Sequence, residues 1–295
     1  MTHHDVAHAD ATDPPLAGVR TLSTEDLKAA LSKGLDDFWA MPTHAIFLCL
    51  IYPIVGLFIA RFTFGYEVLP LLFPLAGGFA LLGPFAAIGL YELSRRREHG
   101  LDTTWSHAFD VLRSPNLGAI VMLGFLMVAV FLIWIAVAQA IYISQFGYGP
   151  PASARSFIDR VFTTPEGWRL ILIGNGVGLL FAVTAMTLTV MSVPMLIDRQ
   201  VSAATAIATS IRVVVANPVV MAMWGLIVAA GLVVGSIPLF FGLAVVMPVL
   251  GHATWHLYRR AVNADMFAPH EYREPSATHR VAADFPVSLF KRERD

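Results

Sequence analysis

The chain has 295 residues, of which 56% are hydrophobic and only 14% are charged, and its formal net charge at pH 7 is −1. Soluble domains have about 25% charged residues, so this composition excludes an ordinary water-soluble fold. The near-neutral charge also excludes the basic field that gathers nucleic acid, so no nucleic-acid partner is expected.

The chain begins with a polar segment, residues 1–22, that is predicted to be a disordered tail. It contains no apolar stretch of the kind that a signal peptide needs. The first membrane helix is therefore expected to stay in the mature protein.

A membrane domain is predicted over residues 23–262, because long apolar stretches alternate there with short polar segments. Each stretch comes close to or exceeds the roughly 17–25 residues that cross the hydrocarbon layer. The last two are separated only by a tight turn at Gly235 to Pro238, and the number of spans falls if this region is one re-entrant unit. The predicted spans are 44–62, 68–90, 117–143, 168–190, 219–236 and 237–257.

A similar unit occurs three times in this domain: an amphipathic segment, a proline and two membrane helices. The amphipathic segments are too short to span and are expected to lie in the membrane interface. The fold class is therefore all-α, a polytopic bundle of six helices as three hairpins, each preceded by an interfacial helix. The amphipathic segments are 27–39, 105–112 and 204–215, and the prolines that follow them are Pro42, Pro115 and Pro218.

The second membrane helix of each unit also contains a proline near its predicted cytoplasmic end: Pro84, Pro194 and Pro248. An interior proline removes a backbone hydrogen bond and kinks a helix. Three kinked helices around a common centre are expected. Glycines at 77–78 and 174–178 are expected to let helices approach closely.

Lysine and arginine gather in the N-terminal tail, the second and fourth loops and the C-terminal tail, which is polar over residues 263–295. Because short loops rich in these residues stay in the cytoplasm, both termini are predicted to be cytoplasmic. Residues 147–167 form the sizeable loop on the opposite side.

Charged and histidine side chains follow the three repeated prolines. If the hairpins pack around one axis, these groups converge in a polar cluster at the cytoplasmic mouth; if not, each is a separate interface anchor. The cluster would comprise Glu92, Asp198 and His256 with Arg95, Arg199 and Arg259.

Several runs resemble a bacterial family of predicted integral membrane proteins, the domain of unknown function 2189. They are 83–92 (GPFAAIGLYE), 194–199 (PMLIDR), 216–218 (ANP) and 251–260 (GHATWHLYRR). The resemblance covers roughly residues 27–262 and implies a multi-pass protein of the bacterial inner membrane. Some members are labelled cytochrome c oxidase subunits, which implies a respiratory association but no activity.

An oxidase core needs several membrane-embedded histidines as haem and copper ligands. Only His44 and His252 are placed to lie at any depth in the membrane. His252 and His256, four residues apart, suit the edge of a zinc or copper site better than one haem, and the single cysteine, Cys49, adds no cysteine-based site. No cofactor, metal or catalytic residue is therefore predicted.

Three classes of function are compatible with these features. A non-catalytic accessory, assembly or scaffold protein of a membrane complex, such as a respiratory oxidase, fits best. A small-solute transporter or channel is the alternative, since repeats and kinked helices are common in transporters, although the spans contain few ionisable groups. A membrane enzyme is least favoured, because no nucleophile–base pair or paired carboxylates can be recognised.

Overall fold

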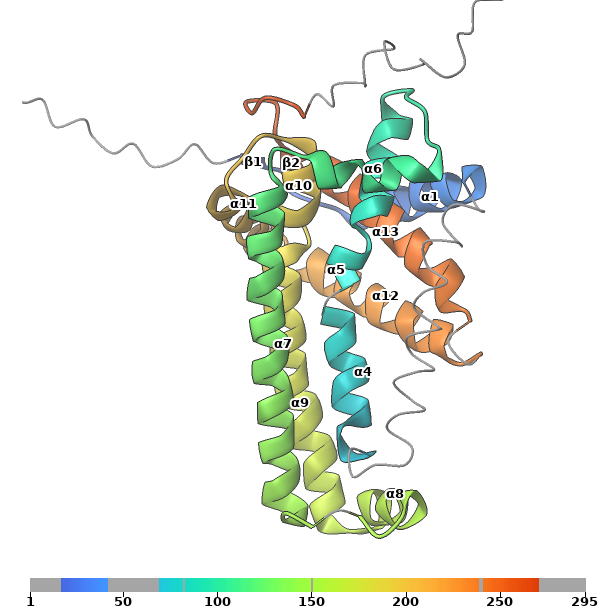
Figure 1. Cartoon of the computed structure of the whole chain (residues 1–295), viewed down its shortest axis with the longest axis vertical. Coiled ribbons are helices and arrows are strands. Elements are labelled where there is room, and N and C mark those ends of the chain that lie inside the picture. Colours follow the sequence, from blue (N-terminus) through green and yellow to red (C-terminus); the bar gives the residue numbers. More distant parts are fainter. Residues whose placement is uncertain (1–16, 42–68, 82, 150, 239–240, 271–295) are drawn as a thin grey trace, which may run out of the picture.

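A computed structural model describes residues 17–41, 69–81, 83–149, 151–238 and 241–270. This part of the chain is almost entirely helical (Figure 1). Its strands, β1 (Gly18–Val19) and β2 (Val262–Asn263), form one short antiparallel ladder that joins the two ends of the described chain. An all-α membrane protein is thereby confirmed.

Two long antiparallel helices, α7 (Leu117–Phe146) and α9 (Pro165–Thr189), run parallel to the long axis of the molecule (Figure 1). At about 1.5 Å per residue α7 is about 45 Å long, which exceeds the roughly 30 Å of a bilayer's hydrocarbon core. The loop that joins them holds α8 (Ala154–Thr163), which lies across one end of the pair. The predicted loop at 147–167 is therefore partly helical.

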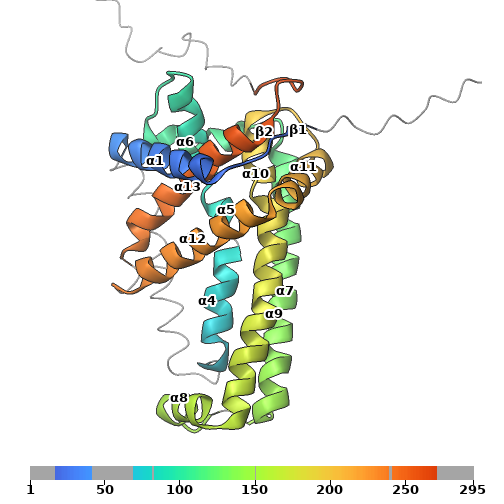
Figure 2. The same cartoon turned by 180° about the vertical axis from the view of Figure 1, so that it is seen from behind.

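Three amphipathic segments lie crosswise at the opposite end of the α7–α9 pair (Figures 1 and 2). They are α1 (Thr24–Ala40), the 3₁₀ helix η2 (Trp105–Arg113) and α11 (Ala203–Ala216). Each ends two residues before a proline, as expected from the steric limits on the residue that precedes proline. The three segments thus gather on one face of the molecule. We call them, with the segments packed against them, the cap, and this face the cap side.

The predicted second span, 68–90, is divided into four elements rather than one helix. They are η1 (Leu69–Leu71), α4 (Leu72–Leu81), α5 (Gly83–Ala86) and α6 (Ile88–Glu98). Pro84 lies in α5, between α4 and α6, and because proline has no N–H it cannot donate to the helical hydrogen-bond ladder. The chain thus bends at this point, and α6 enters the cap.

The last hairpin consists of α12 (Pro218–Ser236) and α13 (Leu243–Ala261). It runs obliquely away from the α7–α9 pair, and its turn lies about level with the middle of that pair (Figures 1 and 2). Helix α1 packs along α13. The third predicted hairpin therefore extends less far from the cap side than the second, which contains α7 and α9.

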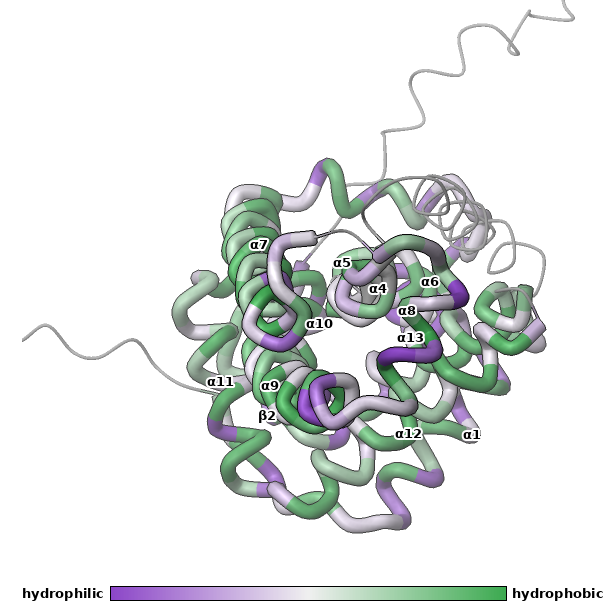
Figure 3. Tube along the Cα trace, turned by 90° about the horizontal axis from the view of Figure 1, so that it is seen from below, coloured by the Kyte–Doolittle hydropathy of each residue, from purple (hydrophilic) through white to green (hydrophobic). Residues whose placement is uncertain are grey.

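Three helical stretches among the described residues are long and apolar enough to cross a membrane: Leu117–Phe146, Pro165–Asp198 and Pro218–Ser236. The predicted first span, 44–62, lies outside the described residues. Viewed along the long axis, α7 and α9 are mainly hydrophobic, as Figure 3 shows. Six spans and three equivalent hairpins around one centre therefore remain predictions.

The buried core of the described residues has two main parts and a third, small one of Met41, Leu93 and Ala108. The larger lies on the cap side and includes Trp224, Trp255 and Tyr258, each no more than 1% exposed. The smaller surrounds Trp134 between α4, α7 and α9. A Cβ on Gly178 would lie 3.1 Å from the Trp134 ring, and one on Gly78 would overlap the Phe131 ring. The predicted close approach is thus seen at these two glycines, while a Cβ at Gly77, Gly174 or Gly176 would meet no described atom within 4 Å.

The folded body extends past the limits predicted for the membrane domain. Before α1, Ala17 and Leu22 are buried, and the Leu22 amide donates a 2.7 Å hydrogen bond to Asn217 Oδ1. After β2, Ala264 and His270 are buried. Residues 17–22 and 263–270 therefore belong to the cap.

Candidate functional site, a buried charge network in the cap

The close crossing of α1 and α13 positions the most buried ionisable groups. Helix α1 begins at a capping box, in which Ser23 and Asp26 bond each other's backbone N–H groups. One turn before the site, a Cβ on Gly34 would lie 2.6–2.8 Å from the backbone and Cβ of Ala253. Only glycine permits this approach, which brings Asp37 of α1 against His256 of α13.

Asp37 lies at the centre of the network and is only 3% exposed. Its Oδ2 accepts hydrogen bonds from Ser94 Oγ at 2.6 Å and from His256 Nε2 at 2.9 Å. Its Oδ1 accepts a charge-assisted bond from Arg97. Burial alone would raise the pKa of Asp37, but the hydrogen bonds from His256 and Ser94 and the nearby histidines outweigh it and lower the pKa to about 2.

Ser94 links this carboxylate to His252. Because Ser94 donates its only hydroxyl proton to Asp37, the 2.7 Å contact with His252 requires Nδ1 of that ring to be the donor. The other nitrogen, Nε2, is buried without a hydrogen-bond partner among the described residues. The order of groups differs from a Ser–His–Asp triad, where the histidine lies between serine and aspartate. Ser94 is also 1% exposed, so the arrangement offers no accessible nucleophile.

A second group of charges surrounds Glu92, which is fully buried on α6. Arg95 donates from Nε and Nη2 to the two carboxylate oxygens at 2.9 and 3.2 Å. Arg96 lies 3.9 Å from the same carboxylate and donates to Asp110 of η2 at 3.3 Å. Burial raises the pKa of Glu92, and the bonds from Arg95 only partly offset this. The group fastens η2 to α6.

A third group surrounds Asp198 at the end of α10 (Ser192–Asp198). Tyr258 donates to Asp198 Oδ2 at 2.8 Å, Arg199 at 3.0 Å and Arg259 at 3.3 Å. Arg259 also donates to Glu98 of α6 at 3.1 Å. This group therefore holds α10, α13 and α6 together.

The acids and the histidine of the predicted polar cluster thus have different side-chain partners, and the backbone of His270 links two of the groups, since Arg95 donates to its carbonyl and its amide donates to the carbonyl of Asp198. The structure brings Asp198 together with Arg199 and Arg259, places Glu92 against Arg95, and places His256 against Asp37. Residues that the sequence reasoning did not single out are Asp37, Ser94, Arg97, Glu98 and Tyr258. The one available signal was Asp37, an acid on the same face of α1 as the buried Leu27, Ala30 and Gly34.

Double substitutions measure whether these groups act as one unit. We expect Glu92→Gln and Asp198→Asn to add within about 0.5 kcal/mol, because the contacts above tie them to different arginines. Asp198→Asn with Arg259→Gln, whose side chains are in contact, should show a coupling greater than that. Thermal unfolding of the single and double variants in detergent measures both, and strong coupling between Glu92 and Asp198 would restore the single cluster.

The three predicted kink prolines have different surroundings. Pro84 lies in the short helix α5 between α4 and α6, and Pro194 lies in α10, just after the end of α9. Pro248 lies inside α13, which continues through it from Leu243 to Ala261. Two of the three prolines thus accompany a change of element.

The same geometry bears on whether the described residues could bind a metal ion or a haem. No group of three or more His, Cys, Asp or Glu side chains in the described ranges could hold a metal ion. His256 Nε2 is engaged by Asp37. His44 and Cys49 lie outside the described residues.

Purified protein is expected to show no haem absorption, because haem iron needs axial ligands that this set of histidines does not supply. The reduced-minus-oxidised spectrum is the measurement. A stoichiometric Soret difference that disappears in a His44→Ala or His252→Ala variant would contradict the prediction.

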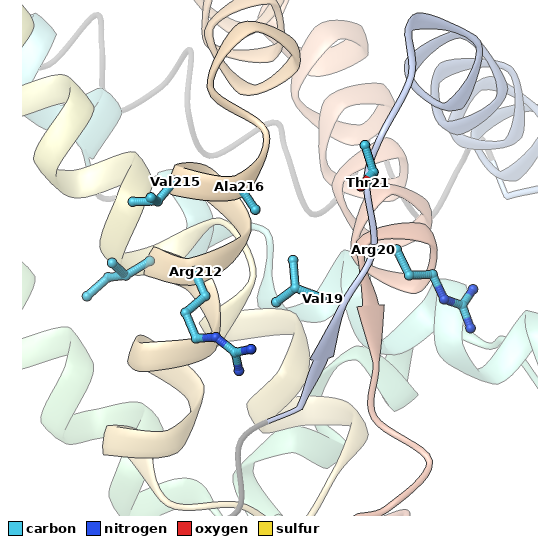
Figure 4. Close-up of a pocket in the computed structure, with 7 residues that line it drawn as sticks. Val19, Arg20, Thr21, Arg212, Val215 and Ala216 are labelled. Carbon is cyan, nitrogen blue, oxygen red and sulfur yellow. The ribbon is translucent and has the colours of Figure 1, made fainter.

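An open pocket on the cap side lies between β1 and α11 and is lined by Val19, Thr21, Arg212 and Val215 among others (Figure 4). Arg212 is already engaged, since it donates to the carbonyl of Ala17 at 3.0 Å. The side chain of Arg20 points away from α11 in Figure 4. The two arginines therefore do not converge on one ligand.

Comparison with known proteins gives a family but no activity. No curated protein and no solved structure matches the chain. The family model described as a predicted integral membrane protein, domain of unknown function 2189, matches residues 72–198, a shorter part of the chain than the 27–262 of the sequence resemblance. Residues 72–198 thus match the family of predicted integral membrane proteins, domain of unknown function 2189, that the sequence runs resemble.

Proposed function

We propose that the protein is a non-catalytic accessory, assembly or scaffold protein of a membrane complex. The observation that carries this proposal is the separation of charge from the membrane core. Helices α7 and α12 contain no Asp, Glu, Lys, Arg or His, and the charged groups of the cap are bonded to one another. A cap whose buried charges are bonded to one another is suited to holding helices in place rather than to transforming a substrate.

The apolar outer faces of the long helices supply the surface for such a role. Phe125 on α7, Leu180 on α9 and Leu226 on α12 are 71%, 67% and 70% exposed. Within a bilayer these faces contact lipid or the helices of another protein. The partner that the family labels favour is a respiratory oxidase, and the location that they favour is the bacterial inner membrane, with the cap and both termini in the cytoplasm.

A small-solute transporter or channel is the second candidate, because the broken helices at Pro84 and Pro194 are a common ingredient of transporters. Such proteins place ionisable groups along the path of an ion or proton. Here Glu166 and Arg169 at one end of the α9–α10 stretch and Asp198 at the other leave its middle uncharged. This distribution of charge favours a scaffold over a transporter or channel.

Photo-crosslinking from the membrane faces tests the proposal. A photoreactive residue at Phe125 or Leu180 should give a crosslink to one defined membrane protein in native membranes, identified by mass spectrometry. Tyr148, which is 89% exposed in the loop after α7, is the matched control position.

An oxidase subunit captured at Phe125 or Leu180, but not at Tyr148, would support the respiratory assignment. Crosslinks to lipid alone, together with solute or ion flux in proteoliposomes of the purified protein, would replace the scaffold by the transporter.

A further inference from the structure

The α12–α13 hairpin has its two ends on the same side of the molecule. Helix α12 starts directly after the interfacial helix α11, and α13 ends in β2, which pairs with β1 in the cap. The turn between them lies about level with the middle of the α7–α9 pair rather than at the far end beside α8 (Figures 1 and 2). A hairpin that crossed the membrane would place its turn at the level of α8.

The length of α13 that lies outside the cap is also too short to cross the membrane. Ala253 is in contact with the crosswise helix α1, and beyond it His256, Arg259 and Arg260 are bonded within the cap. Residues 243–253 rise only about 16 Å. This is about half of the roughly 30 Å hydrocarbon core, and the bonded charges prevent α13 from sliding deeper.

The turn has the composition of a segment surrounded by lipid. Residues 233–245 contain no charged side chain, and Val234, Ile237 and Phe241 are 61%, 75% and 58% exposed. The α7–α9 connection, by contrast, contains Arg155, Asp159, Arg160, Glu166 and Arg169. One turn is built for water and headgroups, and the other is not.

Backbone groups of a turn within lipid must be satisfied internally, because no water is present to bond them. The amides of Ile237, Phe241 and Ala244 donate to the carbonyls of Val234, Pro238 and Phe241 at 3.0–3.3 Å. Pro238 has no amide proton to satisfy. The facing ends of α12 and α13 also approach each other closely, since a Cβ on Gly242 would lie 2.7 Å from the Gly235 carbonyl oxygen.

We propose that α12 and α13 form a re-entrant hairpin, which enters the hydrocarbon core from the cap side and returns to it. Ile237 and Phe241 contact acyl chains near the middle of the bilayer. The hairpin does not cross, so the last two of the six predicted spans are one re-entrant unit. This inference is independent of the proposed scaffold function.

Cysteine accessibility in sealed membrane vesicles of both orientations tests the hairpin. The native cysteine is first removed by Cys49→Ser, and single cysteines are then introduced by Ile237→Cys or Phe241→Cys. Tyr148→Cys marks the α8 side, and Arg113→Cys, at a side chain 77% exposed on η2, marks the cap side. The probe is a membrane-impermeant maleimide, and labelling after denaturation in detergent confirms that each cysteine is present.

Tyr148→Cys and Arg113→Cys are expected to react from opposite sides, whereas Ile237→Cys and Phe241→Cys should react from neither until the membrane is dissolved. Reaction of the turn from the Tyr148 side would show a crossing hairpin, and reaction from the Arg113 side would show a hairpin outside the membrane. Either result overturns the proposal.

Spin labels on the same two turn cysteines show whether lipid or protein surrounds the turn. In lipid they should be accessible to oxygen and shielded from a water-soluble nickel complex, like a label at Phe125 on α7. Shielding from both reagents would mean that protein covers the turn, which also overturns the proposal.

Discussion

Replacing Asp37 by asparagine is expected to destabilise the protein by about 3 kcal/mol, because removing one member of a buried charge pair leaves the others without compensation. Asp37 accepts bonds from Ser94, His256 and Arg97, and an asparagine amide would point a donor at one of these donors. In a domain of this size the loss lowers Tm by roughly 5–10 °C. Thermal unfolding in detergent measures it.

The neighbouring Asp36 provides the control, since it is exposed on the same helix and Asp36→Asn removes the same charge. Its Tm should change little. Equal losses for the two variants would mean that net charge, and not the buried contacts, accounts for the effect.

The same comparison has a defined pH dependence. A carboxyl group whose folded-state pKa is lowered stabilises the fold above its unfolded pKa, and this contribution is lost as the pH falls through the folded value. For Asp37 the ordinary pKa is 3.8 and the folded pKa is about 2. The stability gap between the native protein and Asp37→Asn should therefore be constant above about pH 5 and narrow as the pH falls toward about 2.

Gly34→Ala is expected to destabilise the protein by about 2–3 kcal/mol, because overpacking a close contact forces backbone shifts. The added methyl group would lie 2.6 Å from the Ala253 backbone nitrogen, and a backbone atom cannot turn aside as a flexible side chain can. Helices α1 and α13 must separate, which also lengthens the Asp37–His256 hydrogen bond one turn away. The measurement is again the shift of Tm in detergent.

Gly118→Ala is the matched control for this substitution. Gly118 also lies in a helix, but a Cβ there would meet nothing within 4 Å among the described residues. It should be neutral or stabilising by up to about 1 kcal/mol, from the helix propensity of alanine over glycine. A tolerated Gly34→Ala would show that the α1–α13 crossing is looser than described.

Composition and amphipathic periodicity were sufficient to predict the helical membrane class and the three crosswise segments that end before Pro42, Pro115 and Pro218. These are local properties, in which each proline or apolar stripe acts within a few residues. The second and fourth helices illustrate the limit of such reasoning. Prolines 84 and 194 indicated bends, but whether a proline kinks a helix or ends it depends on what neighbouring elements can bond, as the continuous α13 around Pro248 shows.

The buried network was less predictable because its partners are far apart in the sequence. Asp37 and His256 are separated by 219 residues, and no local pattern links them. Glu92, Asp198 and His256 were recognised from their position after the prolines, but the choice of Arg95, Arg259 or Asp37 as a partner depends on helix crossings. The Gly34–Ala253 contact that sets one crossing is visible only in three dimensions.

The pairing of β1 with β2, and of α1 with α13, has a consequence for the order of events during synthesis. Arg20 donates its amide proton to the carbonyl of Ala261, and Arg260 bonds Asp26 at 2.8 Å. Of the helices that the structure describes, the first to leave the ribosome thus has the last as its main partner. Because domains fold as units once their partners are available, α1 lacks its main packing partner, and Asp37 lacks its hydrogen bond from His256, until α13 is made. A chain truncated before residue 243 would therefore lack both the helix that packs along α1 and the His256 partner of Asp37.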